Sequence, residues 1–236
     1  MLPALGGSRT IDVWSFVLDG ALAAPEVLDG VERARLRRMR SPSKRLEFLV
    51  GRSMLRTVLG DVLDVSPAEV LIEYGAHGKP RLPGDELTFN LSHSGDRALV
   101  AVAAGGRVGV DVEQRRPRRP FRRLSRRFFA EAEDRWLHGL QAADRAAGFY
   151  RAWTLKESYL KAIGTGLAFS SRHFAMELAC DPPRLMETGY PGDEPALWHF
   201  ATPEVRGGYA AALCWDGPAR RVRRRQASEL SRHICA

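Results

Sequence analysis

Residues 153–167 combine a helical apolar pattern with a glycine that ends it, and this stretch constrains the fold more than any other. Trp153, Leu160 and Ile163 recur near helical spacing, and Gly164 predicts where the helix ends. The 236-residue chain surrounds this helix with short apolar runs that read as strands. Strands interrupted by helices, without regular βαβ alternation, are typical of the α+β class.

Glu157 and Lys161 lie four residues apart in this helix and therefore share one face. They could form a surface salt bridge, or they could be two halves of a catalytic device. Thr154-x-x-Glu157 also matches a capping box. We disfavour that interpretation because the apolar pattern extends back through Tyr150, which places Thr154 inside the helix.

The remaining elements are expected from periodicity and turn residues. Helices are expected at 29–40, 43–59, 131–140 and 143–163, with one capped turn at 66–69. Strands are expected at 10–18, 70–74, 87–91, 97–103, 107–112, 173–178, 197–201 and 209–215. The strands at 97–103 and 107–112 are predicted to form a β-hairpin, after a loop at 90–95. Residues 217–236 are predicted to be poorly ordered or a frayed helix.

The composition is that of a globular protein with an anionic partner. The net charge is +8 and 44% of the residues are hydrophobic, which suits nucleic acid, a phosphorylated ligand, an acidic protein or an anionic membrane. Cys180, Cys214 and Cys235 are scattered and support neither a zinc site nor a disulfide framework. With no signal-like N-terminus and no run long enough to span a bilayer, we expect a soluble cytoplasmic protein.

Asp111 and Glu113 alternate along an expected strand, so both carboxylates point to one face. Two carboxylates on one face repel each other unless a positive charge lies between them. The pair is either a solvated edge or part of a site for a hard cation such as Mg²⁺, with Glu157 as a possible third ligand.

Three further segments could bind anions. Ser92-His93-Ser94 suits a phosphate-binding loop better than nucleophilic catalysis, because adjacent side chains on an extended chain point in different directions. Gly78-Lys79-Pro80 is a turn. Residues 115–127 contain eight arginines. This arginine run is either a solvated face or a nucleic-acid footprint, although Phe121 is its only aromatic residue.

Taken in order, these segments resemble the 4′-phosphopantetheinyl transferases of the Sfp type. The resemblance rests on four blocks: Gly78-Lys79-Pro80, Phe89-Asn90-Leu91-Ser92-His93-Ser94, Gly109-Val110-Asp111-Val112-Glu113, and Trp153-x-x-Lys156-Glu157-Ser158-x-x-Lys161. A looser fifth block is Lys44-Arg45-Leu46-Glu47-Phe48 with Gly51-Arg52. Together they cover most of residues 44–167. Each block is weak alone, but the ordered set is highly specific.

The resemblance implies an α+β fold of two similar halves related by a pseudo-twofold axis, with the active site between them. The halves are expected at 1–113, with the coenzyme A (CoA)-binding loops and the metal-binding strand, and at 114–216, with the catalytic helix. A basic tail at 217–236 follows. The implied reaction is Mg²⁺-dependent transfer of the phosphopantetheine arm of CoA to a serine of an acyl or peptidyl carrier protein, which releases 3′,5′-ADP.

The resemblance also implies residue roles. The carboxylates of Asp111, Glu113 and Glu157 hold Mg²⁺. The catalytic residues are Glu157 as base, Glu133 as a second candidate base, and Lys161 at the departing ADP phosphate. The residues implied in CoA binding are Lys44, Arg52, Lys79, Ser92, His93, Asp111 and Lys161.

The arginine run then becomes a candidate docking site for an acidic carrier protein. Two halves in one chain argue for a monomer and against the short trimeric holo-synthase class. The carrier's pathway, whether fatty acid, polyketide or nonribosomal peptide biosynthesis, does not follow from these motifs. The competing hypothesis is a basic nucleic-acid-binding protein, which leaves the acidic residues without a role.

Overall fold

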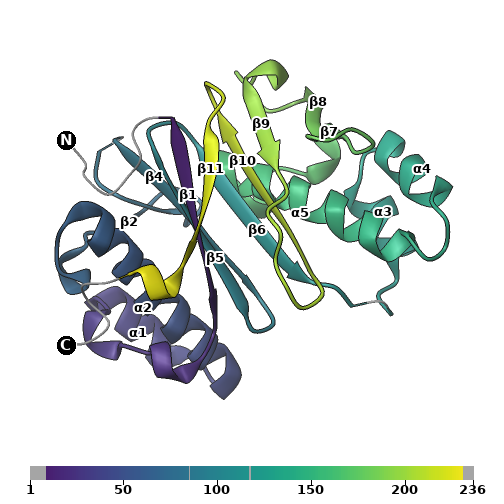
Figure 1. Ribbon diagram of the computed structural model, residues 1–236. Coiled ribbons are helices and arrows are strands. Elements are labelled where there is room, and N and C mark those ends of the chain that lie inside the picture. The colour runs from purple at the N-terminus through teal and green to yellow at the C-terminus, as the bar shows by residue number, and fades with distance from the viewer. Residues whose placement is uncertain (1–8, 85, 117, 231–236) are drawn as a thin grey trace.

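The computed structural model describes residues 9–84, 86–116 and 118–230. Two sheets occupy its centre, with α1 and α2 on one side and α3, α4 and α5 on the other (Figure 1). The helices are α1 (Gly30–Arg38), α2 (Pro42–Leu63), α3 (Phe121–Phe128), α4 (Glu131–Gly139) and α5 (Arg145–Ile163). This arrangement confirms the α+β class, and each central sheet has one long helix against it.

The first sheet has the strand order β11-β1-β5-β4 and the second β6-β10-β9. The strands of the first are β1 (Thr10–Val17), β4 (Leu87–Ser94), β5 (Arg97–Ala104) and β11 (Arg221–Gln226). Those of the second are β6 (Val108–Gln114), β9 (Trp198–Ala201) and β10 (Tyr209–Asp216). Two small ribbons pair β2 (Glu73–Tyr74) with β3 (Pro80–Arg81) and β7 (Phe174–Glu177) with β8 (Arg184–Thr188). The capping box at Ser66 opens a single 3₁₀ turn, Pro67–Glu69.

Three apolar clusters hold these layers together. One lies between α2 and the first sheet and includes Trp14 and Leu55. The second packs α5 against the second sheet and includes Tyr159. The third includes Val13 and Val110 and lies between the two sheets. Burial on both faces explains why β5 is almost continuously apolar rather than alternating.

Gly109 sets the distance between β6 and α5. A Cβ at this position would lie 1.9 Å from the Ser158 carbonyl oxygen and 2.5 Å from the Ala162 nitrogen. Both atoms belong to the backbone of α5, so no side-chain rotation could relieve the clash. A glycine is therefore required where β6 carries its acidic residues past the helix.

Side chains, rather than backbone pairs, join β4 to β6. Val110 N donates to Asn90 Oδ1 (2.9 Å), Val112 N to Ser92 Oγ (3.2 Å) and Gln114 N to Ser94 Oγ (3.2 Å). The constant offset of 20 residues means that the two strands run parallel. The predicted loop at 90–95 is therefore wrong up to Ser94, because β4 continues as a strand that presents these polar groups to β6.

The predicted hairpin of residues 97–103 with 107–112 is also wrong. The hairpin is β4–β5, whereas β6 pairs antiparallel with β10. Gly105 and Gly106, both at positive φ, carry the chain from one sheet to the other. Two adjacent glycines signal a reversal but do not specify which strands pair across it.

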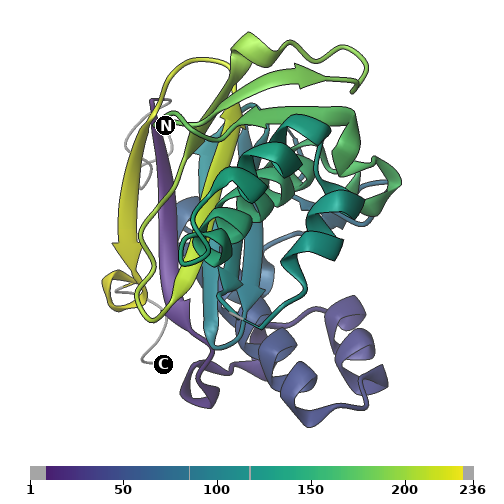
Figure 2. The ribbon, with the colours of Figure 1, turned by 90° about the vertical axis from the view of Figure 1, so that its right-hand side faces the viewer.

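The C-terminal segment differs most from expectation, because Arg221–Gln226 form β11 and pair parallel to β1. Figure 2 shows β11 (yellow) beside β1 (purple). Arg223 forms a bidentate ion pair with the buried Asp12, at 2.5 Å for each bond. The basic residues of this segment predicted a poorly ordered tail, but Arg223 instead neutralises the Asp12 carboxylate inside the sheet.

The sheets also change the expected division of the chain. Residues 108–113 were assigned to the first half, yet β6 belongs to the second sheet; residues 217–236 were assigned to a tail, yet β11 belongs to the first. Residues 231–236, including Cys235, lie outside the described residues, and Cys180 and Cys214 are free thiols. In the part of the chain that the structure describes, no helix is both long enough and apolar enough to cross a bilayer.

Candidate functional site

The polar residues predicted from the sequence meet where β4, β6 and α5 come together. Lys161 Nζ donates to Asp111 Oδ1 (2.6 Å) and to Ser92 Oγ (2.7 Å), and Ser92 Oγ donates to Asp111 Oδ1 (3.0 Å). One residue thus comes from each element. The pairing of Glu157 and Lys161 as an isolated surface salt bridge is not found, because Lys161 binds Asp111 instead.

Burial raises the pKa of two of the carboxyls at this junction, Asp111 and Glu157. Burial raises the pKa of Asp111, although the adjacent Lys161 ammonium opposes the shift. Burial, reinforced by the negative charge of Asp111, raises the pKa of Glu157 to about 7. Glu113 adds further negative charge at both carboxyls and accepts a hydrogen bond from Ser94 Oγ (2.8 Å). Three carboxylates at one junction repel one another, and a positive charge placed among them would stabilise their ionised forms.

One atom shows where a divalent cation fits this group. Asp111 Oδ2 is buried and has no hydrogen-bond partner among the described residues. A buried carboxylate oxygen without a partner is costly, whereas a hard cation would satisfy it. The described side chains do not form a ready-made cluster of three metal ligands. In this structure the positive charge beside Asp111 is the Lys161 ammonium.

His93 lies on the opposite face of β4, among cationic side chains. Burial is the main cause that lowers its pKa, and the positive charges of Lys161, Lys44 and Arg52 act in the same direction. Glu47 lies 3.7 Å from His93 Nδ1 and 2.6 Å from Lys44 Nζ. This surplus of positive charge favours a bound anion.

Arg52 and Lys44 differ in their surroundings although both come from α2. Lys44 is exposed, whereas Arg52 is buried beside Glu32, at 3.8 Å, and against the rings of Phe48 and Tyr74. Arg52 Nη1 is buried without a hydrogen-bond partner in the described part of the chain. Arg52 is thus the more preorganised of the two expected phosphate ligands.

Lys79 is placed differently from expectation. Its ammonium donates to the Ala162 carbonyl (2.9 Å) and the Val108 carbonyl (3.1 Å), and burial lowers its pKa to about 8. Lys79 therefore ties the end of α5 to the start of β6, and its donors do not point to the anion-binding residues around His93. A lysine in a turn gives no sequence signal that it is bound to backbone carbonyls.

Glu133 does not have the geometry of a second base. Its two oxygens accept from Lys156 Nζ at 2.7 and 2.6 Å, and also from the backbone N–H groups of Met176 and Ala130. Glu133 and Lys156 are 1% and 2% exposed, so substrate cannot reach the pair. The expectation that Glu133 is catalytic is corrected: it anchors α5 through Lys156, the residue next to Glu157.

Replacing Glu133 by glutamine is expected to destabilise the protein by about 3 kcal/mol, because the Lys156 ammonium is left buried without its counter-ion. Denaturant unfolding measures this change. The folded variant should keep a kcat of the same order as the parent. A kcat loss as large as that of a Glu157→Gln variant, measured on folded protein, would restore Glu133 as a base.

The arginine run folds into α3 and the linker before it. Phe121 packs against Phe149 with a centroid separation of 4.9 Å, and Phe128 against Trp153 at 5.4 Å. These contacts turn the arginine side chains outward, except that of Arg119, whose guanidinium lies over Tyr150 at 6.0 Å. The remaining exposed arginines are Arg115, Arg116, Arg118, Arg122, Arg123, Arg126 and Arg127.

Sequence reasoning missed three structural contributors to the site. Asn90 and Ser94 join Ser92 in bridging β4 to β6, and Lys156 holds α5 through Glu133. The alternation of Asn90, Ser92 and Ser94 is a period-two polar pattern, so a strand with one polar face could have been inferred. Nothing local in the sequence signals the burial of Lys156.

Comparison with known proteins agrees with this geometry. Residues 107–214 match the 4′-phosphopantetheinyl transferase superfamily, and residues 13–105 match the 4′-phosphopantetheinyl transferase N-terminal family. The chain is 40% identical over 172 residues to 4′-phosphopantetheinyl transferase HetI of Nostoc sp., covering 68% of this chain and 71% of HetI. It is 27% identical over 188 residues to 4′-phosphopantetheinyl transferase Sfp of Bacillus subtilis, covering 79% and 81%.

Among solved structures, a holo-(acyl-carrier-protein) synthase from Bacillus anthracis in complex with CoA (3′,5′-ADP) aligns with a TM-score of 0.39 and 21% identity. The alignment covers 47% of this chain and 94% of the synthase. The assignment rests on the sequence matches, which extend across both sheets and include the β4, β6 and α5 residues described above. The chain belongs to the 4′-phosphopantetheinyl transferase family and is a transferase enzyme.

Proposed function

We propose that the junction of β4, β6 and α5 is where the phosphopantetheine group passes from CoA to a carrier protein. The hydroxyl oxygen of a carrier serine attacks the phosphorus that bears the pantetheine arm. A new P–O bond forms to the serine, the P–O bond to the ADP portion breaks, and 3′,5′-ADP leaves. The observation that supports this most is the convergence of Asp111, carried by β6, with Glu157 and Lys161, both carried by α5.

Asp111, Glu113 and Glu157 would hold Mg²⁺. Asp111 Oδ2 would gain most from the cation, because it is buried and has no hydrogen-bond partner among the described residues. When bound, Mg²⁺ neutralises charge on the pyrophosphate oxygens and fixes their orientation. The Lys161 ammonium, which donates to Asp111 and Ser92 in this structure, would donate to the departing phosphate. Such a charge-assisted hydrogen bond strengthens as negative charge develops on the phosphate.

Glu157 is the proposed base. Glu157 lies one helical turn from Lys161, and burial raises the pKa of Glu157 to about 7 before a cation binds. A carboxyl with a raised pKa is a more effective proton acceptor than an ordinary glutamate. The serine proton passes to Glu157, directly or through one water. Glu133 takes no part in this step because all its lone pairs are directed to structural partners.

The anion-binding residues around His93 are proposed to take the phosphates of CoA. Lys44 and Arg52 supply the charge, and His93, whose pKa is lowered, offers its imidazole as a hydrogen-bonding group. Ser92 acts mainly as the hydrogen-bonded link between Asp111 and Lys161. Lys79, originally expected to bind CoA, would contribute by holding the end of α5. Because one chain supplies β4, β6 and α5, we propose that the enzyme acts as a monomer.

The decisive experiment is intact-protein mass spectrometry of an apo carrier protein mixed with the enzyme, CoA and Mg²⁺. We expect a mass gain equal to one phosphopantetheine arm, and no gain when EDTA is present in the reaction from the start. A panel of fatty acid, polyketide and nonribosomal peptide carriers identifies the substrate. No mass gain on any carrier, together with salt-sensitive nucleic-acid binding, would support the competing basic binding protein.

The exposed arginines of α3 are proposed to attract an acidic carrier. Replacing Arg122, Arg123 and Arg126 by alanine is expected to raise KM for the carrier about fivefold to tenfold at low salt, with little change in kcat. The effect should shrink as salt screens the charges. The matched control replaces Arg37, Arg38 and Arg40, which are exposed near α1. Equal KM values for the two triple variants at low salt would exclude α3 as the docking surface.

A further inference from the structure

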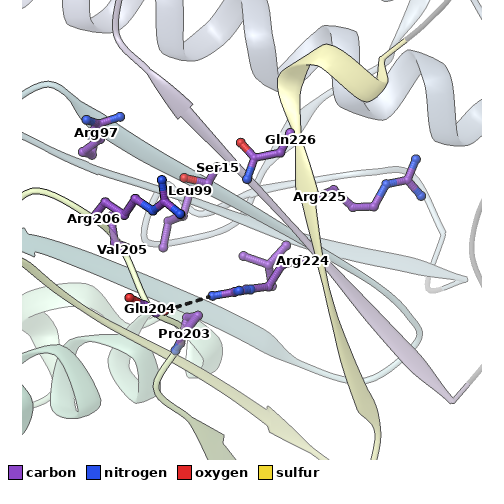
Figure 3. Close-up of a pocket in the computed structure, with 11 residues that line it drawn as sticks. Ser15, Arg97, Leu99, Pro203, Glu204, Val205, Arg206, Arg224, Arg225 and Gln226 are labelled. Atoms are coloured by element: carbon purple, nitrogen blue, oxygen red, sulfur yellow. Dashed lines mark ion pairs between the residues drawn. The ribbon is translucent and has the colours of Figure 1, made fainter.

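Away from the catalytic residues, a pocket of about 380 Å³ opens between the first sheet and residues 203–206 (Figure 3). Its floor is formed by Val13 of β1 and Leu99 of β5, which are 2% and 1% exposed. The pocket lies on the side of the sheet toward β11, whereas β4, which carries Ser92 and His93, forms the opposite edge. None of the proposed CoA or metal ligands lines it.

Arginines from three separate segments surround this floor. Arg97 comes from β5, Arg206 from the segment between β9 and β10, and Arg224 from β11. Figure 3 shows Arg206 and Arg224 extending over the pocket. Segments distant in the sequence thus each place an arginine in the lining of one pocket. Like charges around one pocket repel, and an anion would relieve that repulsion.

The acidic residues nearby compensate these charges poorly. Glu204 is the only acidic residue among the described residues that line the pocket. It lies 3.8 Å from Arg224, and the two side chains are 79% and 61% exposed. An ion pair this long and this solvated contributes little. Arg97 Nε is buried without a hydrogen-bond partner in the described part of the chain, and its nearest carboxylate, Asp96, is 3.6 Å away.

A fourth lining arginine, Arg225, has a different role. Its Nε lies 2.8 Å from Glu229, and its guanidinium lies 5.6 Å from the centre of the Trp14 ring. In Figure 3 it points away from the other three. The cationic part of the pocket is therefore Arg97, Arg206 and Arg224.

We propose that this pocket binds a phosphorylated small molecule that carries at least two negative charges. The planar guanidinium matches phosphate oxygens bidentately, and arginines from three directions suit a di- or polyanion better than a single carboxylate. The volume is in the range of small-ligand sites. The recessed apolar floor accommodates a compact ligand rather than the flat surface of a macromolecule.

Such a ligand would also link β5, β11 and the 203–206 segment. Because it binds the folded chain only, it should raise the thermal unfolding midpoint in a saturable manner. A general ionic effect would instead follow ionic strength and would be reproduced by sodium chloride.

Isothermal titration calorimetry with inorganic pyrophosphate, at constant ionic strength and without Mg²⁺, tests the proposal. The variants Arg206→Ala and Arg224→Ala remove pocket charge, Arg221→Ala removes the same charge from an exposed neighbour on β11, and Lys161→Ala alters the catalytic site. We expect one binding component to weaken about tenfold or more in the first two variants, since each loses a charge-assisted hydrogen bond. The same component should persist in the other two.

The proposal fails if pyrophosphate does not bind, if binding is lost only in Lys161→Ala, or if all four variants weaken it equally. Unfolding midpoints without ligand show whether each variant is folded. Repeating the titration with 3′,5′-ADP distinguishes the source of the phosphate. Tighter binding than pyrophosphate would identify a nucleotide, and equal or weaker binding an inorganic phosphate.

Discussion

Replacing Asp111 by asparagine is expected to lower kcat/KM for carrier modification by about 10³-fold or more. The change keeps the shape of the side chain but removes the charge that fixes Lys161 and the oxygen proposed to bind Mg²⁺. Losing a single preorganised electrostatic contact at a reaction centre typically costs 10²–10³-fold, and here two are lost together. The rate of carrier mass gain at saturating Mg²⁺ measures the effect.

Asp12 provides a matched control. Like Asp111, it is a buried strand aspartate held by a cationic side chain, but it belongs to the β1–β11 pair. Asp12→Asn is expected to reduce stability while the folded enzyme keeps its kcat. Near-normal turnover by Asp111→Asn would mean that the reaction does not depend on this carboxylate. Equal kcat losses in both variants would point to a general structural effect.

Replacing Gly109 by alanine is expected to destabilise the protein by about 3 kcal/mol or more, at or above the upper end of the overpacking range. The added methyl group would meet the backbone of α5 at Ser158 and Ala162, so the helix must move away from β6. Because Asp111 lies on β6 while Glu157 and Lys161 lie on α5, the same movement separates the catalytic groups. Activity should therefore fall even in the fraction that remains folded.

Gly51→Ala is the control for this substitution. Gly51 lies inside α2, and a Cβ there would have its nearest contact at 3.8 Å, with Leu91. Alanine at an unstrained helical position should be neutral or stabilise by about 0.4–1 kcal/mol. Urea unfolding and carrier transfer, measured on both variants, check the prediction. A Gly109→Ala protein as stable and as active as the parent would show that α5 can shift freely on β6.

The sequence predicted elements better than pairings. Local periodicity was sufficient for β1, α1, α4 and α5, whose boundaries lie close to the expected ones. Local periodicity failed where the sheet to which a strand belongs, or whether a segment is a strand at all, depends on a partner distant in the sequence. The β5 and β6 segments are adjacent in sequence but belong to different sheets, and β11 looked like a disordered basic segment because its partner β1 is at the other end of the chain.

The same distinction applies to the site. The alternation of Asp111 and Glu113, and the spacing of Glu157 and Lys161, were enough to predict two functional faces. That Lys161 would bind Asp111, rather than Glu157, depended on how closely α5 approaches β6. Glu133 and Lys79 matched family positions, yet burial and backbone contacts give both a structural role, and neither effect is encoded in a short motif.

The pairing of β1 with β11 also dictates the order in which the protein can be completed during synthesis. Asp12 and Arg223 are 211 residues apart, so at typical elongation rates the ribosome adds Arg223 roughly 10–40 s after Asp12. Until then β1 has an unpaired edge and Asp12 lacks its counter-ion. β1 is thus made first, but its backbone hydrogen bonds and its ion pair are among the last to be completed. A nascent chain released early would expose a strand edge prone to intermolecular pairing.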